Sequence, residues 1–525
     1  MEVQTMKITK IDYAATGAFS KTISDYLCCS EQLQPFYNHF PTLASFAAQL
    51  QEKNFDQEQR QTLHQALQEQ YTSIPDISPK VQQHIDLLLQ PNTYTVTTGH
   101  QLNIFTGPLY FVYKIITAIN TCKQLQEKYP DYNFVPVYWM ATEDHDFAEI
   151  NHFNLFGKTY TWETDQAGAV GRFSTESMAQ LLEELPEVYP VFEEAYRNSK
   201  TLADATRAIT HALFGEYGLV SIDGDHATLK KALTPVVEQE LTGQLSNQLV
   251  EEASAQLEEL GYKPQVYSRE INLFYLTDDL RERIVEEDGK YKVLNTDLTF
   301  TREQIRQEAQ EHPERFSPNV ILRPLYEELI LPNLAYIGGA AEVAYWFQLK
   351  KLFAKYKVAF PLLMLRNSAL YISRSNASRM HKLGLQPQDL FQDFQELKKQ
   401  LSGQLHEEEI SLAAQREAVA AAYAEVEKLA ESIDPTLVKA VGAEAQKAAN
   451  SLQMLEKKLS KARDSKHEQT FKQLENLKEK LFPGGSLQER KDNLLTFQTN
   501  NPDFIPALVE AFDPLEFKFT ILEEA

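Results

Sequence analysis

The sequence predicts an α/β fold, with a parallel sheet at its core and a helical coiled coil toward the C-terminus. A strand-like run at 93–99 is followed by a helix opened by Pro108, and a second buried strand follows at 134–140. A strand, a crossover helix and a strand with this spacing form a βαβ unit, which implies parallel pairing. A heptad pattern after Leu385 predicts the coiled coil.

The other elements follow in order along the chain. Residues 1 to about 90 carry helical signals, in clusters such as PTLASFAAQL and VQQHIDLLL. Further strands of the same sheet are expected at 218–223, 334–339 and 358–365. The long mixed segments between them, at about 155–210 and 235–325, indicate insertions into this sheet.

The heptad pattern predicts a long antiparallel helical hairpin. Apolar residues fall seven apart at Leu405, Leu412, Val419, Val426 and Ile433. Asp434 and Pro435 then supply a helix cap and a first-turn proline, and PGG at 483–485 ends a second apolar helix. Such a hairpin, about 45 residues long, would span about 65 Å. It cannot bury its whole seam against a compact core, so we expect it to join two copies of the chain as a homodimer.

Composition narrows the possible classes of function. The net charge is −23, from 51 basic and 74 acidic side chains. Such a field repels phosphate backbones, so we expect a small-molecule substrate and not a nucleic acid. No apolar run is long enough to span a membrane, and the N-terminal stretch lacks the features of a secretory signal. The cysteines, Cys28, Cys29 and Cys122, form no CxxC pair, which predicts a reduced, cytoplasmic protein.

The stretch TVTTGHQLNIFTGPLYFVYK (95–114) joins the first strand of the βαβ unit to its helix. In open α/β sheets ligands bind beyond the carboxyl ends of the strands, and free N–H groups at a helix start attract anions. This stretch is therefore a candidate anion site. Its candidate substrate- or nucleotide-binding residues are Gly99, His100, Gln101, Thr106, Gly107, Tyr110 and Lys114. The alternative is that the two glycines only allow tight turns and that the histidine is an ordinary loop residue.

A second cluster, PVYWMATEDHDFAEIN (136–151), places several ionisable residues directly after a buried strand. Such residues are costly there unless they face water or a ligand. A carboxylate could hold or deprotonate an amine, and a histidine could act as acid or base. The candidate catalytic residues are Glu143, Asp144, His145 and Asp146, with Asn151 as a binding residue. The alternative is a solvated loop with a capping aspartate.

The same cluster is a weak zinc site, because it lacks a third well-spaced ligand such as cysteine. No dedicated metal is therefore expected. A magnesium ion carried by a nucleotide fits the carboxylates better.

Three further strand ends carry polar side chains. An aspartate at a strand end also occurs in plain turns, and a glutamate near a helix start also suits the helix dipole. An arginine at such an edge is well shaped for a carboxylate or phosphate. The candidate binding residues at these ends are Asp223, Glu342, Tyr345, Trp346, Arg366, Asn367 and Ser368. Five polar ends on one sheet predict a shared site.

The chain contains, in this order, the segments TGHQLNIFTGPLYFVYK, PVYWMATEDHDFAEINH, NLFYLTDDLRERI, RFSPNVILRPLYEELILPNLAYIGGAAEVAYW and PLLMLRNSAL. In this combination it resembles the BshC family of bacillithiol biosynthesis over nearly its whole length. The resemblance implies a Rossmann-like core similar to that of class I nucleotidylyltransferases and class I aminoacyl-tRNA synthetases. It also implies connecting-peptide insertions, a dimerising coiled coil, and a ligase that joins cysteine to the amine of glucosaminyl-malate.

The resemblance also suggests domain boundaries. The core is expected at 1–160, 211–235 and 326–385, with connecting-peptide-like insertions at 161–210 and 236–325. The helical coiled-coil domain is expected at 386–500, and a tail that packs back on the core at 501–525.

Forming an amide in water requires an activated carboxylate, so ATP with magnesium is the expected activator of cysteine. The Gly99–Gly107 turn would hold the activated carboxylate or the phosphates. Asp144, His145 and Asp146 would bind ammonium groups, one of them taking the proton. Lys114, Arg366 or Arg323 would receive the malate. The alternatives are a nucleotidyltransferase-like enzyme acting on another small acid or amine, and a non-enzymatic coiled-coil scaffold.

Overall fold

The computed structural model describes residues 6–404 and 411–524. The chain divides into two compact units. The core unit comprises Ile8–Leu370 and Ser486–Ile521. The coiled-coil unit comprises Tyr371–Gly485 together with the short segments Met1–Lys7 and Leu522–Ala525. The core therefore ends near 370 and resumes at 486, whereas the sequence placed these boundaries at 385 and 501.

The core unit is built on a five-stranded parallel sheet with the order β13–β12–β2–β3–β6. Its strands are β2 (Thr93–His100), β3 (Asn133–Met140), β6 (Val220–Asp223), β12 (Asn333–Gly338) and β13 (Leu362–Leu365). All five were predicted, and the parallel pairing is confirmed. The register pairs His100 with Met140, so β2 and β3 end side by side.

Helix α5 (Tyr110–Lys128) is the crossover between β2 and β3 and packs on both strands. It begins two residues later than predicted, because the backbone of Pro108 forms a bridge with Asn493 in place of a first helical turn. Helices are also confirmed in the N-terminal region, after a strand, β1 (Met6–Asp12), that was not predicted. These helices are α1 (Lys21–Leu27), α2 (Ser45–Glu52), α3 (Gln57–Gln70) and α4 (Pro79–Leu87).

Two long segments interrupt the parallel sheet. The first, between β3 and β6, contains α6 (Phe147–Ile150), the hairpin of β4 (His152–Leu155) and β5 (Lys158–Thr161), α7 (Met178–Glu183), α8 (Pro190–Asn198) and α9 (Leu202–Phe214). The second, between β6 and β12, begins with the helices α10 (Ala227–Lys230), α11 (Thr234–Gly243) and α12 (Leu245–Glu259).

The second segment then forms an antiparallel sheet of its own, in the order β10–β9–β8–β7–β11. Its elements are β7 (Leu273–Leu276), β8 (Arg281–Glu287), β9 (Lys290–Val293), β10 (Thr299–Phe300), α13 (Arg302–Glu311), β11 (Phe316–Pro318) and α14 (Arg323–Ile330). We call these five strands the inserted sheet.

The rest of the core unit closes around the parallel sheet. Its helices are α15 (Ala340–Trp346), α16 (Lys350–Tyr356), α21 (Leu495–Gln498) and α22 (Phe504–Ala511). The segment with α21 and α22 packs on α5, where the side-chain amide of Asn120 donates to the carbonyls of Val509 (2.9 Å) and Phe512 (2.7 Å). A small sheet has the order β1–β15–β14, with β14 at Ala369–Ile372 and β15 at Lys518–Glu524.

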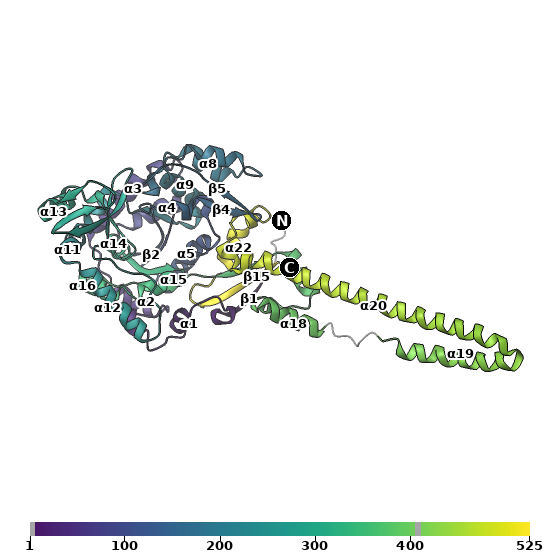
Figure 1. Ribbon diagram of the computed structural model, residues 1–525. Helices are drawn as coiled ribbons and strands as arrows, with labels where there is room; N and C mark the ends of the chain where they lie inside the picture. Colours follow the sequence, from purple (N-terminus) through teal and green to yellow (C-terminus); the bar gives the residue numbers. More distant parts are fainter. Residues whose placement is uncertain (1–5, 405–410, 525) are drawn as a thin grey trace. The chain divides into compact units, whose positions relative to one another are not determined.

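The coiled-coil unit contains α17 (Arg374–Lys382), α18 (Phe394–Gln404), α19 (Ala413–Ile433) and α20 (Val438–Leu481). Helices α19 and α20 form the predicted hairpin (Figure 1). The side chain of Asp434 accepts the N–H of Thr436 (2.9 Å), and Pro435 follows it, so the predicted turn is confirmed. Helix α20 has 44 residues, but α19 has only 21, so the first arm is shorter than predicted; Leu405 lies outside the described residues.

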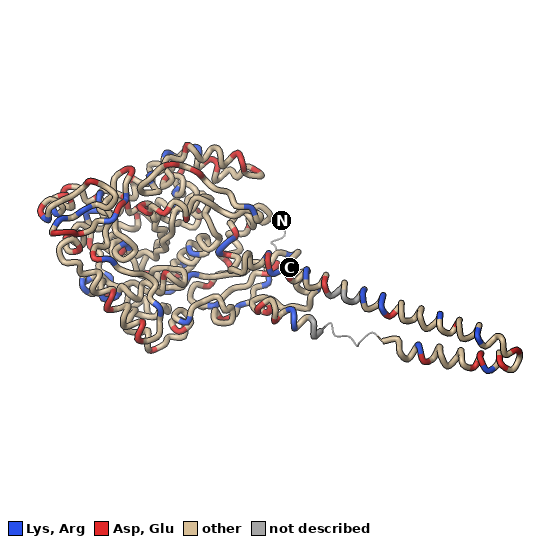
Figure 2. The backbone as a smooth tube through the Cα atoms, viewed as in Figure 1, with Lys and Arg blue, Asp and Glu red and all other residues tan. Residues whose placement is uncertain are grey.

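Charged residues of both signs are interspersed along both arms of the hairpin (Figure 2). Within 6–404 and 411–524, no helix combines the length and the hydropathy of a membrane span.

Candidate functional site

A cavity of about 680 Å³ opens at the carboxyl ends of the parallel strands. Residues that follow each of the five strands line it, as the sequence predicted for a shared site. The predicted residues that line it are Gly99, His100, Gln101, Tyr110, Lys114, Glu143, Asp144, His145, Asp146, Glu342, Tyr345 and Arg366. The predicted residues that are not among the described lining residues are Thr106, Gly107, Asn151, Asp223, Trp346, Asn367 and Ser368.

The second half of the predicted anion turn is held by protein groups. The side-chain amide of Asn493 donates to the carbonyls of Phe105 and Gly107 (2.7 Å each), and the N–H of Leu109 donates to the carbonyl of Asp492 (2.8 Å). Gly107 has a φ of 58°, so glycine is required by the turn itself. The chain near 493 therefore holds the carbonyl side of this turn, and Thr106 and Gly107 are not among the described residues that line the cavity.

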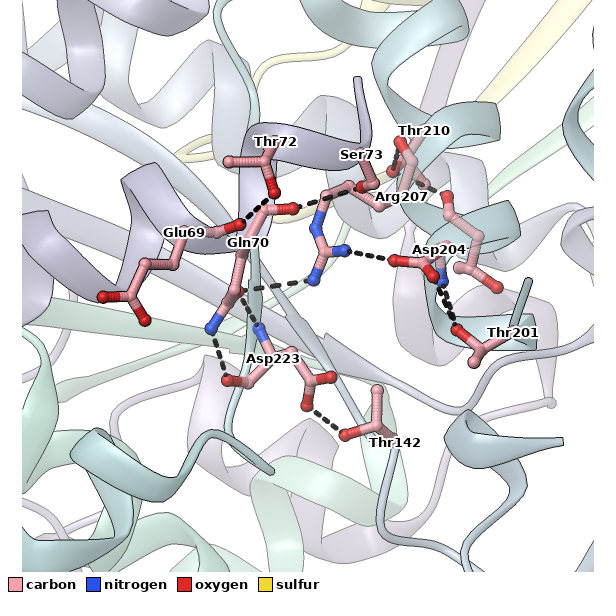
Figure 3. A network of polar contacts seen from close by, with 11 residues as sticks. Glu69, Gln70, Thr72, Ser73, Thr142, Thr201, Asp204, Arg207, Thr210 and Asp223 are labelled. Carbon is pink, nitrogen blue, oxygen red and sulfur yellow. Dashed lines mark hydrogen bonds and ion pairs between the residues drawn. The ribbon is translucent and has the colours of Figure 1, made fainter. Parts of the chain in front are cut away.

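Asp223 is not among the described residues that line the cavity, and it bonds Thr142 at the start of the acidic loop (Figure 3). Its carboxylate accepts hydrogen bonds from the hydroxyl of Thr142 and from the N–H of Asp225 (2.8 Å). The side chain of Gln70 bonds both its N–H (2.8 Å) and its carbonyl (2.9 Å). Burial raises the pKa of Asp223. This residue anchors the loop that begins at Thr142, so its predicted role in substrate binding is replaced by a positioning role.

The other four predicted residues that are not among the described lining residues make local contacts that support the fold. Trp346 is buried and stacks on Tyr336, with 4.5 Å between the ring centroids. Ser368 accepts a hydrogen bond from the guanidinium of Arg366 (2.9 Å), and Asn367 donates to the carbonyl of Asp513 (2.9 Å). Asn151 ends α6, and its carbonyl accepts the N–H of Trp162 (2.7 Å).

Three cations that line the cavity already have carboxylate partners. Lys114 donates to the carbonyl of Gly99 (2.6 Å) and forms an ion pair with Glu342 (2.6 Å). Arg323 pairs with Glu327 (2.7 Å), and Arg366 pairs with Glu489 (2.7 Å). Burial lowers the pKa of Lys114, and Glu342 opposes this shift.

A neutral histidine packs beside these pairs. Burial, with a smaller contribution from Lys114, lowers the pKa of His100 to about 3. Its ring lies 5.3 Å from that of Tyr110 and 5.2 Å from that of Phe111, between centroids. Its Nε2 is buried and has no hydrogen-bond partner among the described residues. At neutral pH, His100 is therefore an uncharged donor or acceptor and not a base in equilibrium with its acid.

The acidic loop after β3 is organised by its own hydrogen bonds. One carboxylate oxygen of Asp144 accepts from the amide of Gln101 (2.8 Å), and the other accepts the N–H groups of His145 (2.8 Å) and Asp146 (3.3 Å). The Gln101 contact confirms that the ends of β2 and β3 meet. Asp146 is exposed, and no ion pair or hydrogen bond of its carboxylate is found within the described residues. Asp146 is thus the carboxylate of this loop most available to a ligand.

Glu143 and His145 have fixed partners. Glu143 forms an ion pair with the buried Lys230, and burial raises the pKa of Glu143. The Nδ1 of His145 lies 2.6 Å from a guanidinium nitrogen of Arg281. Because a guanidinium only donates, Nδ1 accepts and the ring proton lies on Nε2. With Nδ1 occupied, His145 presents a donor to the cavity, whereas the sequence had suggested either an acid or a base.

Sequence reasoning missed the contribution of the inserted sheet to this cavity. Arg281 and Arg283 on β8 line it, as do Arg269, Tyr267 and Asn319 of the same insertion. The alternation in LRERI (280–284) indicates a strand with both arginines on one face. It does not indicate which element that face meets.

Known proteins match the chain over nearly its full length. The family model described as "Bacillithiol biosynthesis BshC, N-terminal Rossmann-like domain" matches residues 6–367, and the model described as "Bacillithiol biosynthesis BshC, C-terminal coiled-coil domain" matches 369–524. These two models confirm the Rossmann-like core and the coiled coil.

Individual relatives agree with the family models. The chain is 45% identical to a protein of Flavobacterium johnsoniae, over 98% of this chain and 99% of the relative. It is 42% identical to a protein of Cytophaga hutchinsonii, over 97% and 98%. It is 30% identical to a protein of Chlorobaculum tepidum, over 88% and 86%. All three carry the name "Putative cysteine ligase BshC". The chain therefore belongs to the BshC family of bacillithiol biosynthesis.

Proposed function

We propose that the chain is a ligase that forms an amide between the carboxylate of cysteine and the amine of glucosaminyl-malate, giving bacillithiol. Family membership supports the reaction class. One observation of the structure supports it most: the same cavity at the strand ends is lined by the available carboxylate of Asp146 and by Arg269, Arg281 and Arg283 of the second insertion. A carboxylate suits an ammonium group that must lose a proton, and arginines suit anionic substrates.

The reaction needs an activated acyl group. ATP with magnesium, when bound, would supply this activation by converting the cysteine carboxylate into an acyl-adenylate with release of pyrophosphate. The cavity fits an anionic co-substrate, because its lining has seven arginines and lysines against four acidic residues in a chain of net charge −23. The amine nitrogen then bonds to the acyl carbon, the bond from that carbon to the phosphate oxygen breaks, and the amine proton leaves.

The acidic loop would receive that proton. The carboxylate of Asp146 has the freedom to accept it, whereas both oxygens of Asp144 are held by hydrogen bonds. Asp144 would keep the loop in shape and add negative charge beside the ammonium group. The Nε2–H of His145 would donate to an oxygen of the substrate. His100 and the backbone after Gly99 would border the acyl group.

The test is direct. The purified protein is incubated with cysteine and glucosaminyl-malate, with and without ATP and magnesium, and bacillithiol, AMP and pyrophosphate are quantified by mass spectrometry and a coupled assay. We expect product only with the nucleotide. Product without any activated donor would refute the adenylate step, and pyrophosphate release that requires a different acceptor would favour a nucleotidyltransferase of another specificity.

One variant in the acidic loop, with a control variant outside it, tests the role of Asp146. Asp146→Asn should lower the rate about 10²- to 10⁴-fold, the range for loss of a general base. Asp165→Asn is the matched control, because Asp165 is exposed and lies outside the cavity lining. A rate for Asp146→Asn close to that of the control would remove Asp146 from the mechanism.

We also propose that the hairpin pairs two copies of the chain as a homodimer. Several large apolar side chains are exposed on its arms, among them Leu429 (61%) and Ile433 (71%) on α19 and Met454 (61%) on α20. A second copy would cover them. Sedimentation equilibrium should show a dimer for the full chain and a monomer for the variant Leu429→Glu with Ile433→Glu. An unchanged mass for the variant would refute this pairing.

The expected cytoplasmic location forms part of this proposal. Cys28, Cys29 and Cys122 are all free thiols, as a reduced compartment requires.

A further inference from the structure

The inserted sheet presents a basic wall to the cavity. Phe274 of β7 and Arg283 of β8 are direct partners across the two antiparallel strands, so their side chains lie on the same face. Arg281 is two residues from Arg283 and shares that face, with its guanidinium 4.0 Å from the centroid of the Phe274 ring. All three residues line the cavity, together with Arg269 from the loop before β7.

Two cations of this wall, Arg269 and Arg283, differ from Lys114, Arg323 and Arg366, which also line the cavity. Those three each have a glutamate partner. By contrast, no carboxylate lies within ion-pair distance of Arg269 or Arg283 in the described part of the chain. These two side chains therefore have charge and hydrogen-bond donors to offer a ligand.

Arg281 joins this wall to the acidic loop. Its guanidinium donates to His145 Nδ1 (2.6 Å), Ser317 Oγ (3.0 Å) and the carbonyl of Pro318 (3.2 Å). All three acceptors are uncharged, so the positive charge of Arg281 is not cancelled by a direct partner. Because Asp146 is in the same loop as His145, one molecule could place an ammonium group at Asp146 and anionic groups at the wall.

We infer that Arg269 and Arg283, with the charge of Arg281 behind them, form the subsite for the two carboxylates of the acceptor's malyl group. This inference rests on the proposed function and replaces Lys114, Arg323 and Arg366 as the expected malate receivers, because those three are already neutralised. Guanidinium groups bind carboxylates through paired N–H donors, which suits a dicarboxylate. The phosphates of a nucleotide share this chemistry, so the experiment must separate the two sources.

Calorimetric titrations of the full chain separate them without turnover. The ligands are glucosaminyl-malate, the methyl glycoside of glucosamine, which lacks the malyl group, and ATP with magnesium. The variants are Arg283→Gln and Arg269→Gln, and the matched control is Arg306→Gln, an exposed arginine on α13 of the same insertion that is not in the cavity lining.

Each cavity variant should bind glucosaminyl-malate about tenfold or more weakly, the scale of one lost charge-assisted pair. The control should match the wild type, and the cavity variants should bind the methyl glycoside and ATP as the wild type does. Because Arg269 lies in a loop and Arg283 in a strand, a folding defect in one variant leaves the other as a test.

Two results would overturn the inference. One is unchanged affinity of both cavity variants for glucosaminyl-malate, and the other is a loss confined to ATP, which would assign this wall to phosphates. Failure of the proposed function would look different: glucosaminyl-malate would bind in an arginine-dependent way, and no amide would form in the ligase assay.

Discussion

The replacement His100→Gln tests how the core unit responds to acid. In the folded chain the pKa of His100 is lowered from 6.5 to about 3, mainly because its ring is buried. In the unfolded chain the pKa returns to its ordinary value near 6.5. Between these values the unfolded state binds a proton that the folded state does not, so the free energy of unfolding falls as the pH falls below about 6.5.

The magnitude follows from the difference in proton binding. A pH of about 5 is about 1.5 units below the pKa of the histidine in the unfolded chain. Protonation of the unfolded chain therefore lowers the free energy of unfolding by about 2 kcal/mol, at about 1.4 kcal/mol per pH unit. At a pH of about 7.5 the cost is close to zero. Glutamine has a similar polar side chain and does not titrate, so the variant should lose about 2 kcal/mol less stability than the wild type between these two pH values.

Urea unfolding at the two pH values, followed by tryptophan fluorescence, measures this difference. Trp139, Trp162 and Trp346 are the three tryptophans of the chain and all lie in the core unit, so the signal reports that unit alone. Other titrating groups contribute equally to both proteins and cancel in the comparison. Equal acid sensitivity of the wild type and His100→Gln would refute the assignment of His100 as a buried, neutral ring.

Two further predictions concern stability. Glu489→Ala should lower the free energy of unfolding of the core by about 3–5 kcal/mol, because it leaves the buried guanidinium of Arg366 without its partner. Urea unfolding checks this, with the exposed Glu510→Ala as control; a loss no greater than that of the control would show that the pair does not stabilise the core. Asp434→Ala should lower the stability of the hairpin by about 1 kcal/mol, because the N–H of Thr436 loses its acceptor. Thermal melting followed by circular dichroism checks it, and a melting curve identical to that of the wild type would contradict it.

Much of the core could be predicted from local patterns. The strand at 133–140 is a mainly apolar run, and the strand at 93–100 is rich in the β-branched residues threonine and valine. Both strands are buried over nearly their whole length, as expected inside a parallel sheet. The cap at Asp434 depends on residues adjacent in sequence, so it was also predictable. The predicted start of helix α5 was two residues too early, because the backbone of Pro108 pairs with Asn493. This contact joins residues far apart in the chain and could not be predicted from local patterns.

The candidate site also has features that the sequence predicts and features that depend on contacts between distant residues. Because the carboxyl ends of parallel strands meet at one edge, the sequence by itself determined that the TGHQ turn and the TEDHD loop would be neighbours. Gln101 and Asp144 confirm that expectation with a direct hydrogen bond. The sequence did not determine which charges would remain available to a ligand.

Only the tertiary structure decided that. Glu342, Glu327 and Glu489 neutralise three of the cations, whereas Arg269 and Arg283 of the second insertion line the cavity with no carboxylate partner among the described residues. Ion pairing depends on distances in space of a few ångströms, and a pair such as Lys114 and Glu342 joins residues 228 positions apart. The sequence therefore determines which side chains are charged, but the fold determines which of them have no ion-pair partner and can bind a ligand.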